Sequence, residues 1–129
     1  MIVLASKSAS RRTMLGAAGV IFDVRPAAVD ERALEARMDG AEPGRGALAL
    51  AEAKALSVDG AGRPVLGSDS VVTVAGRRFD KPASRAQAAE HLRYFSGKTM
   101  QLHSAAAIAV GGAVAWRHVA MASLRVRHL

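Results

Sequence analysis

Hydroxyl and cationic side chains gather in residues 6–12, which read Ser-Lys-Ser-Ala-Ser-Arg-Arg. The apolar residues 2–5 that precede them fit a buried strand, and the apolar spacing in residues 9–18 fits an amphipathic helix that Gly19 ends. The hydroxyls and cations therefore lie at a helix start, where free backbone N–H groups and the helix dipole favour an anion. This pattern favours a phosphate site. The alternative is an ordinary capped helix with solvated basic side chains.

Asp69 lies at the centre of an otherwise apolar stretch, residues 64–74. A carboxylate between hydrophobic strand segments is costly to bury unless it meets a cation, a metal ion or several donors. We therefore interpret Asp69 as a functional group, with a turn aspartate that caps backbone amides as the alternative. Further along, Pro82 ends a strand and fixes the preceding Lys81 at the strand end.

Apolar periodicity and turn residues predict the elements that must position these groups. We expect strands over residues 2–5, 20–24, 64–74, 100–110 and 114–126, with a hairpin at residues 111–112. We expect helices over residues 9–18, 47–58 and 84–95, and an exposed charged helix and loop up to Gly46 that includes Asp39. On the helix over residues 47–58, Lys54 lies near the boundary of an apolar face formed by Leu48, Ala51, Ala55 and Val58.

The amino-acid composition limits the classes of protein to which the chain can belong. The chain has 129 residues, 50% of them hydrophobic, which suits one domain with a real core. It has no cysteine, which suits a reducing, cytosolic setting, and no stretch that predicts a membrane segment or a secretory signal. The net charge of +7 implies an anionic partner, but the scarcity of aromatic residues argues against a nucleic-acid stacking surface. The uncovered strand at the C-terminus suggests a truncated fragment.

Six short segments follow one another along the chain: LASKSASRR at residues 4–12, VDE at 29–31, AKA at 53–55, LGSDSVV at 66–72, DKP at 80–82 and FSGKT at 95–99. In this order they resemble the successive motifs of the Maf family. The resemblance covers essentially the entire chain as one domain, residues 1–129. It implies an α/β fold with a mixed twisted sheet, flanking helices and two lobes around a nucleotide cleft, similar to that of inosine triphosphate pyrophosphatases.

The resemblance also implies an activity. Maf-like proteins are cytoplasmic nucleoside triphosphate pyrophosphatases, some of them homodimeric. They use Mg²⁺ or Mn²⁺ and water to split non-standard or pyrimidine nucleoside triphosphates between the α- and β-phosphates. The family is also linked to arrest of septum formation, so a non-catalytic nucleotide-binding or partner-binding protein is the alternative. A basic nucleic-acid-binding module is a third hypothesis, for which the sequence has no recognised motif.

The matching positions imply residue roles. Asp69 matches the general base, with Lys54 and Lys81 as further catalytic groups. The expected metal ligands are Glu31, Asp30 and Asp69, since hard cations prefer carboxylate oxygens. The expected substrate contacts are Ser8, Ser10, Arg11, Arg12 and Ser70, where Arg12 either supports the phosphate contacts or is simply solvated. Ser10 and Ser70 match neither well-known subfamily and leave the base preference open. The four histidines have no metal-ligand spacing and are interpreted as structural.

Overall fold

The computed structural model describes residues 1–38 and 40–129, and Asp39 of the charged segment lies outside the described residues. Six strands form one mixed sheet with the order β2-β1-β3-β5-β6, and β4 pairs with β3 beside this path. The elements are β1 (Ile2–Ala5), α1 (Ala9–Ala17), β2 (Phe22–Arg25), α2 (Glu31–Arg37), α3 (Pro43–Leu56), β3 (Val65–Val74), β4 (Arg77–Phe79), α4 (Arg85–Phe95), β5 (Thr99–Val110) and β6 (Ala113–Arg125). The predicted α/β fold with a mixed sheet and flanking helices is confirmed.

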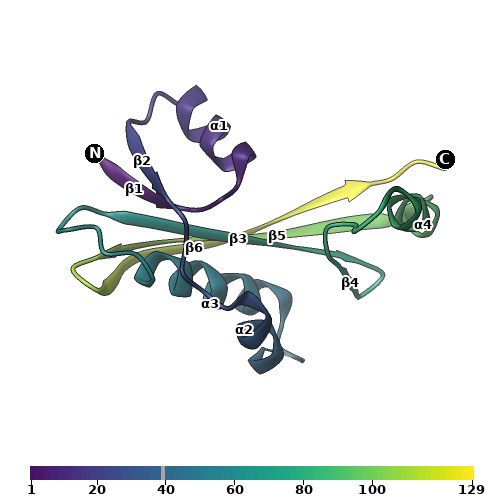
Figure 1. The fold of residues 1–129 in the computed structure, drawn as a ribbon. Helices are drawn as coiled ribbons and strands as arrows, with labels where there is room; N and C mark the ends of the chain where they lie inside the picture. The colour runs from purple at the N-terminus through teal and green to yellow at the C-terminus, as the bar shows by residue number, and fades with distance from the viewer. Residues whose placement is uncertain (39) are drawn as a thin grey trace.

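The elements form two groups along the long strands β3, β5 and β6 (Figure 1). β1, β2 and α1 lie at one end of β3, and β4 and α4 lie at the other end. α3 covers the face of β3 and β5 that is turned away from α1, and α2 lies beside α3. This arrangement agrees with the two lobes that the sequence predicts, and the middle of β3 connects them.

One edge of β3, here called the forked edge, pairs with two different strands at its two ends. β1 pairs with this edge in parallel at Val65 and Leu66, and β4 pairs with it in antiparallel fashion from Val72 to Val74. The opposite edge of β3 pairs with β5 along its whole length. Among the described residues, no strand pairs with the forked edge between residues 67 and 71. Asp69 therefore lies at a split in the sheet, between the segments of β3 that pair with β1 and with β4.

The helix predicted over residues 47–58 is present but begins earlier, at Pro43. Proline is favoured in the first helical turn because its missing N–H group would have no helical partner there. The predicted face is partly wrong, because Lys54 is buried against the sheet and not at a boundary, with only 7% of the residue exposed. The other buried residues of α3 are Gly44, Ala47, Leu50, Ala51 and Ala55.

A close approach between α3 and β3 explains why Lys54 is buried. The alanines of α3 pack on Ala105, Ala107 and Ala109 of β5, and their small side chains leave little distance between the layers. A Cβ atom built on Gly67 would lie 2.5 Å from the backbone nitrogen of Ala55 and would also clash with the carbonyl oxygen of Ala51. Real Cβ atoms do not make such contacts, so only glycine fits at residue 67.

The strand β6 forms an edge of the sheet, and it carries Trp116, Val119, Met121 and Leu124 with 42–56% of each residue exposed. The residues after β6 pack back on the end of α4, where the backbone N–H group of Leu129 donates to Ser96 Oγ over 2.9 Å. Within the described residues, no helix has the length and apolar character that crossing a membrane requires.

Candidate functional site

Lys54 joins two carboxylates at the middle of β3. Its Nζ atom lies 2.7 Å from Glu31 Oε1, at the start of α2, and 3.5 Å from Asp69 Oδ1 on β3. The side chains of Lys54 and Asp69 are 9% and 14% exposed, whereas that of Glu31 is half exposed. One buried ammonium group thus faces two carboxylates, so the group as a whole carries a net negative charge and can accept a further cation.

Asp69 has an oxygen that is available for a ligand. Its Oδ2 atom is buried and has no hydrogen-bond partner among the described residues. Burial raises the pKa of Asp69 above its ordinary value of 3.8, and the charge of Glu31 raises it further, while Lys54 and then Arg11 oppose the shift. A carboxylate with a raised pKa is a stronger base than an exposed one, and buried carboxylates with perturbed pKa values cluster at functional sites.

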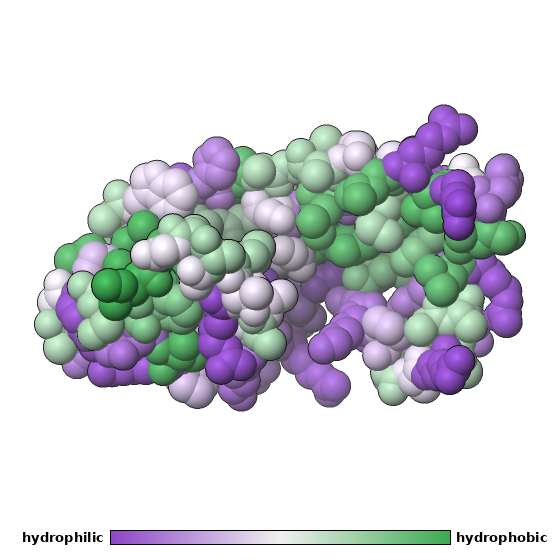
Figure 2. Space-filling view, turned by 90° about the horizontal axis from the view of Figure 1, so that it is seen from above, coloured by the Kyte–Doolittle hydropathy of each residue, from purple (hydrophilic) through white to green (hydrophobic). Residues whose placement is uncertain are grey.

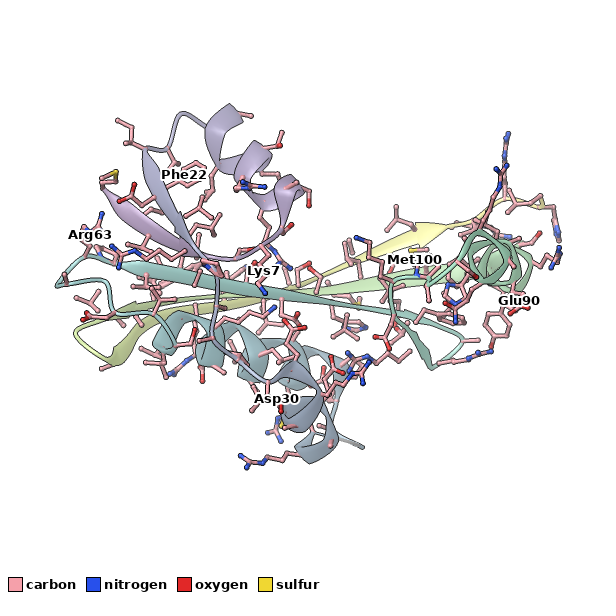
Figure 3. The ribbon with its side chains drawn as sticks, viewed as in Figure 1. Lys7, Phe22, Asp30, Arg63, Glu90 and Met100 are labelled. Atoms are coloured by element: carbon pink, nitrogen blue, oxygen red, sulfur yellow. The ribbon has the colours of Figure 1, made fainter. Side chains whose placement is uncertain are left out.

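A first cavity of about 420 Å³ lies between α1 and α2. Ser6, Ser8 and Arg11 line it from the loop after β1 and from α1, and Glu31 and Lys54 line it from the other side. Lys7, Asp30 and Arg32 complete its polar lining. Figure 3 shows Lys7 over the middle of β3 and Asp30 at the beginning of α2. The predicted anion site at the start of α1 is therefore joined to Lys54, which lies 43 positions after Arg11 in the sequence.

A second cavity of about 450 Å³ has Asp69 in its lining and extends towards β4 and α4. Glu31 lines both cavities. Lys81 and Ser70 line the second cavity, whereas Ser8 and Arg11 line the first. The remaining lining is largely apolar and aromatic and includes Val72, Phe79, Phe95, Met100 and His91. Figure 2 shows a hydrophilic hollow between two more hydrophobic parts of the surface.

The remaining predicted residues have structural contacts or lie outside the cavities. Ser8 is the N-cap of α1, since its Oγ atom accepts from the N–H group of Arg11. The helix start is thus capped, and Ser8 and Arg11 also line the first cavity. Ser10 bonds Ser8 Oγ over 3.0 Å, and Arg12 is exposed and lies outside both cavities. Asp30 caps α2 through Oδ1, which leaves one of its oxygens for another ligand.

Sequence reasoning missed two residues at the second cavity. Arg78 on β4 donates to Glu35 Oε1 of α2 over 2.9 Å, which ties α2 to β4 across the rim. His91, interpreted as structural, packs edge-on against Phe79 with ring centroids 5.0 Å apart and also lines the cavity. The pairing of Arg78 and Glu35 spans 43 positions and has no local sequence signal. For His91, the sequence signal that could have indicated a place at the cavity was its position on the apolar side of α4.

The effect of Lys54 on the pKa of Asp69 can be tested by replacing this lysine. Lys54 lowers the pKa of Asp69, so we expect Lys54→Met to move that pKa further upward from the ordinary value of 3.8. The carboxyl chemical shift of Asp69, followed against pH by NMR, measures this change. Lys98→Met is the matched control, because the Lys98 ammonium contacts Tyr94 outside both cavities. An Asp69 titration that is the same in both variants would contradict the assigned role of Lys54.

Comparisons with known proteins agree on one family. The family model described as "Maf-like protein" matches residues 1–129. A protein named 7-methyl-GTP pyrophosphatase from Rhizobium meliloti is 44% identical over 133 residues, which cover 100% of this chain and 67% of that protein. A protein named nucleoside triphosphate pyrophosphatase from Rhodopseudomonas palustris is 42% identical over 130 residues, which cover 99% of this chain and 64% of that protein.

The fold has a counterpart among solved structures. The structure of a HAM1 protein from Coxiella burnetii matches with a TM-score of 0.54 at 17% sequence identity, covering 95% of this chain and 69% of that chain. At this identity the match supports the α/β fold alone. The chain spans about two thirds of the length of the curated relatives it matches. Residues from all six motif segments line the two cavities. Because the family model also matches the chain from end to end, this chain belongs to the Maf-like protein family.

Proposed function

We propose that this chain is a nucleoside triphosphate pyrophosphatase that hydrolyses the bond between the α- and β-phosphates to give a nucleoside monophosphate and pyrophosphate. One observation carries the proposal. Asp69 has a raised pKa and a buried oxygen without a hydrogen-bond partner among the described residues. It lines the second cavity together with apolar and aromatic side chains, and its ion-pair partner Lys54 lines the first cavity, where Arg11 and Lys7 add positive charge. A nucleoside triphosphate has a matching division into an anionic chain and a planar base. The names of the relatives support the same reaction.

The first cavity suits the phosphate chain. Arg11, Lys7 and Lys54 supply positive charge, and Ser8 adds a hydroxyl group at the N-terminus of α1. Backbone N–H groups at a helix start and fixed cations both stabilise phosphate oxygens. Lys81, which lines the second cavity with Asp69, would meet the α-phosphate or the ribose. Ser10 would support the first cavity through its bond to Ser8 Oγ, whereas Arg12, exposed and outside both cavities, fits the solvated alternative.

Asp69 is the proposed general base. A carboxylate takes a proton from water more effectively when its pKa lies closer to the working pH, and burial moves the pKa of Asp69 in that direction. Lys54 lowers the pKa of Asp69 and so favours its ionised form against the effect of burial. The ammonium group of Lys54 also faces the first cavity, where it can stabilise charge that develops on the phosphates.

A divalent cation, Mg²⁺ or Mn²⁺, fits the residues present. The buried Oδ2 atom of Asp69 lacks a partner among the described residues, and Glu31 is half exposed beside it. Within the described chain, no cluster of three or more His, Cys, Asp or Glu side chains could hold a metal. Mg²⁺ commonly binds through one or two carboxylates together with substrate phosphates, so Asp69 and Glu31 suffice, with Asp30 as a weaker candidate. When bound, the cation would neutralise phosphate charge.

The test is a substrate panel. We expect pyrophosphate release that requires Mg²⁺ or Mn²⁺, measured with 7-methyl-GTP, dTTP, UTP and CTP. The name of the 44% identical relative makes 7-methyl-GTP the first substrate to test. Ser70, which lines the second cavity, is the proposed position that sets base preference, whereas Ser10 lies beside Ser8 at the first cavity. Nucleotide binding by a folded chain without pyrophosphate release would point to a non-catalytic binding protein.

Three further properties complete the proposal. The lack of cysteine suits a cytoplasmic enzyme, and the net charge of +7 is accounted for by an anionic small substrate without invoking nucleic acid or a membrane. The exposed edge strand β6 offers a surface for a homodimer.

A further inference from the structure

On the forked edge of β3, backbone N–H and C=O groups beside Asp69 have no neighbouring strand to pair with among the described residues. The backbone N–H group of Val3 on β1 donates to the carbonyl oxygen of Pro64, immediately before β3. Because backbone groups alternate along a strand, the even-numbered residues of β3 turn their N–H and C=O groups towards β1 and β4, and the odd-numbered residues turn theirs towards β5. Within residues 67–71, the groups on the forked edge therefore belong to Ser68 and Ser70.

These groups have no strand to pair with among the described residues, since β1 reaches only Leu66 and β4 begins at Val72. The side chain of Ser70 is occupied elsewhere, with its Oγ atom 3.4 Å from Ser104 Oγ. Ser70 itself is exposed and lines the second cavity. An unpaired strand edge presents N–H donors and C=O acceptors. It can bind any group that has an acceptor and a donor next to each other in the matching order.

We propose that the unpaired main-chain edge of β3 binds the hydrogen-bonding edge of the substrate's nucleobase, through Ser70 in the lining of the second cavity and the adjoining Ser68, which is outside that lining. This inference rests on the proposed function. A nucleobase edge is planar and carries donors and acceptors next to each other, as a neighbouring strand would. The apolar and aromatic lining around Ser70, which includes Val72, Phe79 and Met100, suits the faces of a flat ring. Base preference would then depend on main-chain geometry as well as on side chains.

The proposal is tested by removing one N–H group without changing a side chain. Ser70 is replaced by its α-hydroxy acid counterpart, which turns the amide N–H into an ester oxygen, and Ser68 is replaced in the same way in a second protein. The probes are the α,β-methylene analogues of 7-methyl-GTP and UTP, which contain a base, and tripolyphosphate, which does not. Calorimetry measures the dissociation constant of each probe in the presence of Mg²⁺.

We expect the nucleotide analogues to bind the unaltered chain more tightly than tripolyphosphate. At least one of the two ester proteins should bind one of the analogues about tenfold more weakly, as expected for the loss of one hydrogen bond in a partly buried site. Tripolyphosphate should bind all three proteins equally, which controls for changes in the phosphate cavity. Equal binding of the analogues by all three proteins would overturn the proposal, as would an equal loss for analogues and tripolyphosphate.

A second measurement does not depend on the folding of the ester proteins. In the unaltered chain, an analogue whose guanine N1 is methylated should lose about tenfold in affinity, because its edge can no longer donate to a main-chain carbonyl. Unchanged affinity would contradict the proposal. Pyrophosphate release separates this inference from the proposed function. If pyrophosphate is released but neither the ester replacements nor N1 methylation changes nucleotide affinity, only this inference is refuted. If they change affinity but no pyrophosphate is released, only the proposed pyrophosphatase activity is refuted.

Discussion

Replacing Asp69 with asparagine should lower kcat for pyrophosphate release by about a thousandfold, in the range that loss of a general base typically produces. Asparagine has nearly the same shape, so the packing between α3 and β3 should persist, but its amide cannot accept a proton from water. Nucleotide binding should weaken far less than turnover, because a base acts in the transition state. Steady-state kinetics of the variant with the best substrate of the panel measure this change.

Asp23→Asn is the matched control. Asp23 lies on β2, bonds Arg63 over 2.9 Å and is outside both cavities, so its substitution should leave turnover unchanged. Turnover of the Asp69→Asn chain within about threefold of the unaltered chain would contradict the role of Asp69.

The pH dependence of the free energy of unfolding gives an independent test of the Asp69→Asn substitution. The pKa of Asp69 is higher in the folded chain than its ordinary value of 3.8, so between these two pKa values the folded chain binds more protons than the unfolded chain. The free energy of unfolding of the unaltered chain should therefore fall as the pH rises through this window. The Asp69→Asn chain should lack this decrease.

The second large effect is expected at Gly67, where alanine should lower the free energy of unfolding by about 3 kcal/mol and also abolish most of the activity. The added Cβ atom would meet the backbone of α3 at Ala51 and Ala55, so the helix has to move away from β3. That movement separates Lys54 from Asp69, whose atoms are already 3.5 Å apart. Denaturant unfolding and pyrophosphate release, measured on one preparation, test both expectations.

Gly16→Ala provides the matched control for Gly67→Ala. Gly16 lies inside α1, and a Cβ atom built there would have nothing within 4 Å. Alanine favours a helix more than glycine does, so this variant should be as stable as the unaltered chain or slightly more stable. If Gly67→Ala behaved like Gly16→Ala, the close packing of α3 on β3 would not be what positions Lys54.

The elements with local signals could be predicted from the sequence. Helix α4 is an example, since Ser84 Oγ accepts from the N–H group of Gln87, as the capping pattern indicates. The hairpin at Gly111 and Gly112 is another, because both residues adopt positive φ angles that glycine favours. Such signals depend on residues within one or two turns of each other, so the sequence contains them directly.

The geometry of the site depends on long-range packing that no local pattern contains. Lys54 appeared to lie at the boundary of a helix face, and its burial follows from the contact between Gly67 and α3, two segments that the sequence predicted separately. The sequence also grouped Lys81 with Arg11, whereas the structure places them in different cavities because β1 and β4 pair with different parts of β3. The roles proposed for these residues rest on the motif resemblance, and their division between two cavities follows from the sheet.

The products of the reaction test the central claim most directly. The chain is incubated with 7-methyl-GTP or the best nucleotide of the panel and Mg²⁺, and phosphorus NMR follows the products over time. We predict equal amounts of nucleoside monophosphate and pyrophosphate, with no nucleoside diphosphate, and loss of both products in the Asp69→Asn chain. Nucleoside diphosphate with orthophosphate, or an intact nucleotide in the presence of a folded chain and metal, would contradict the assignment of this site to pyrophosphatase chemistry.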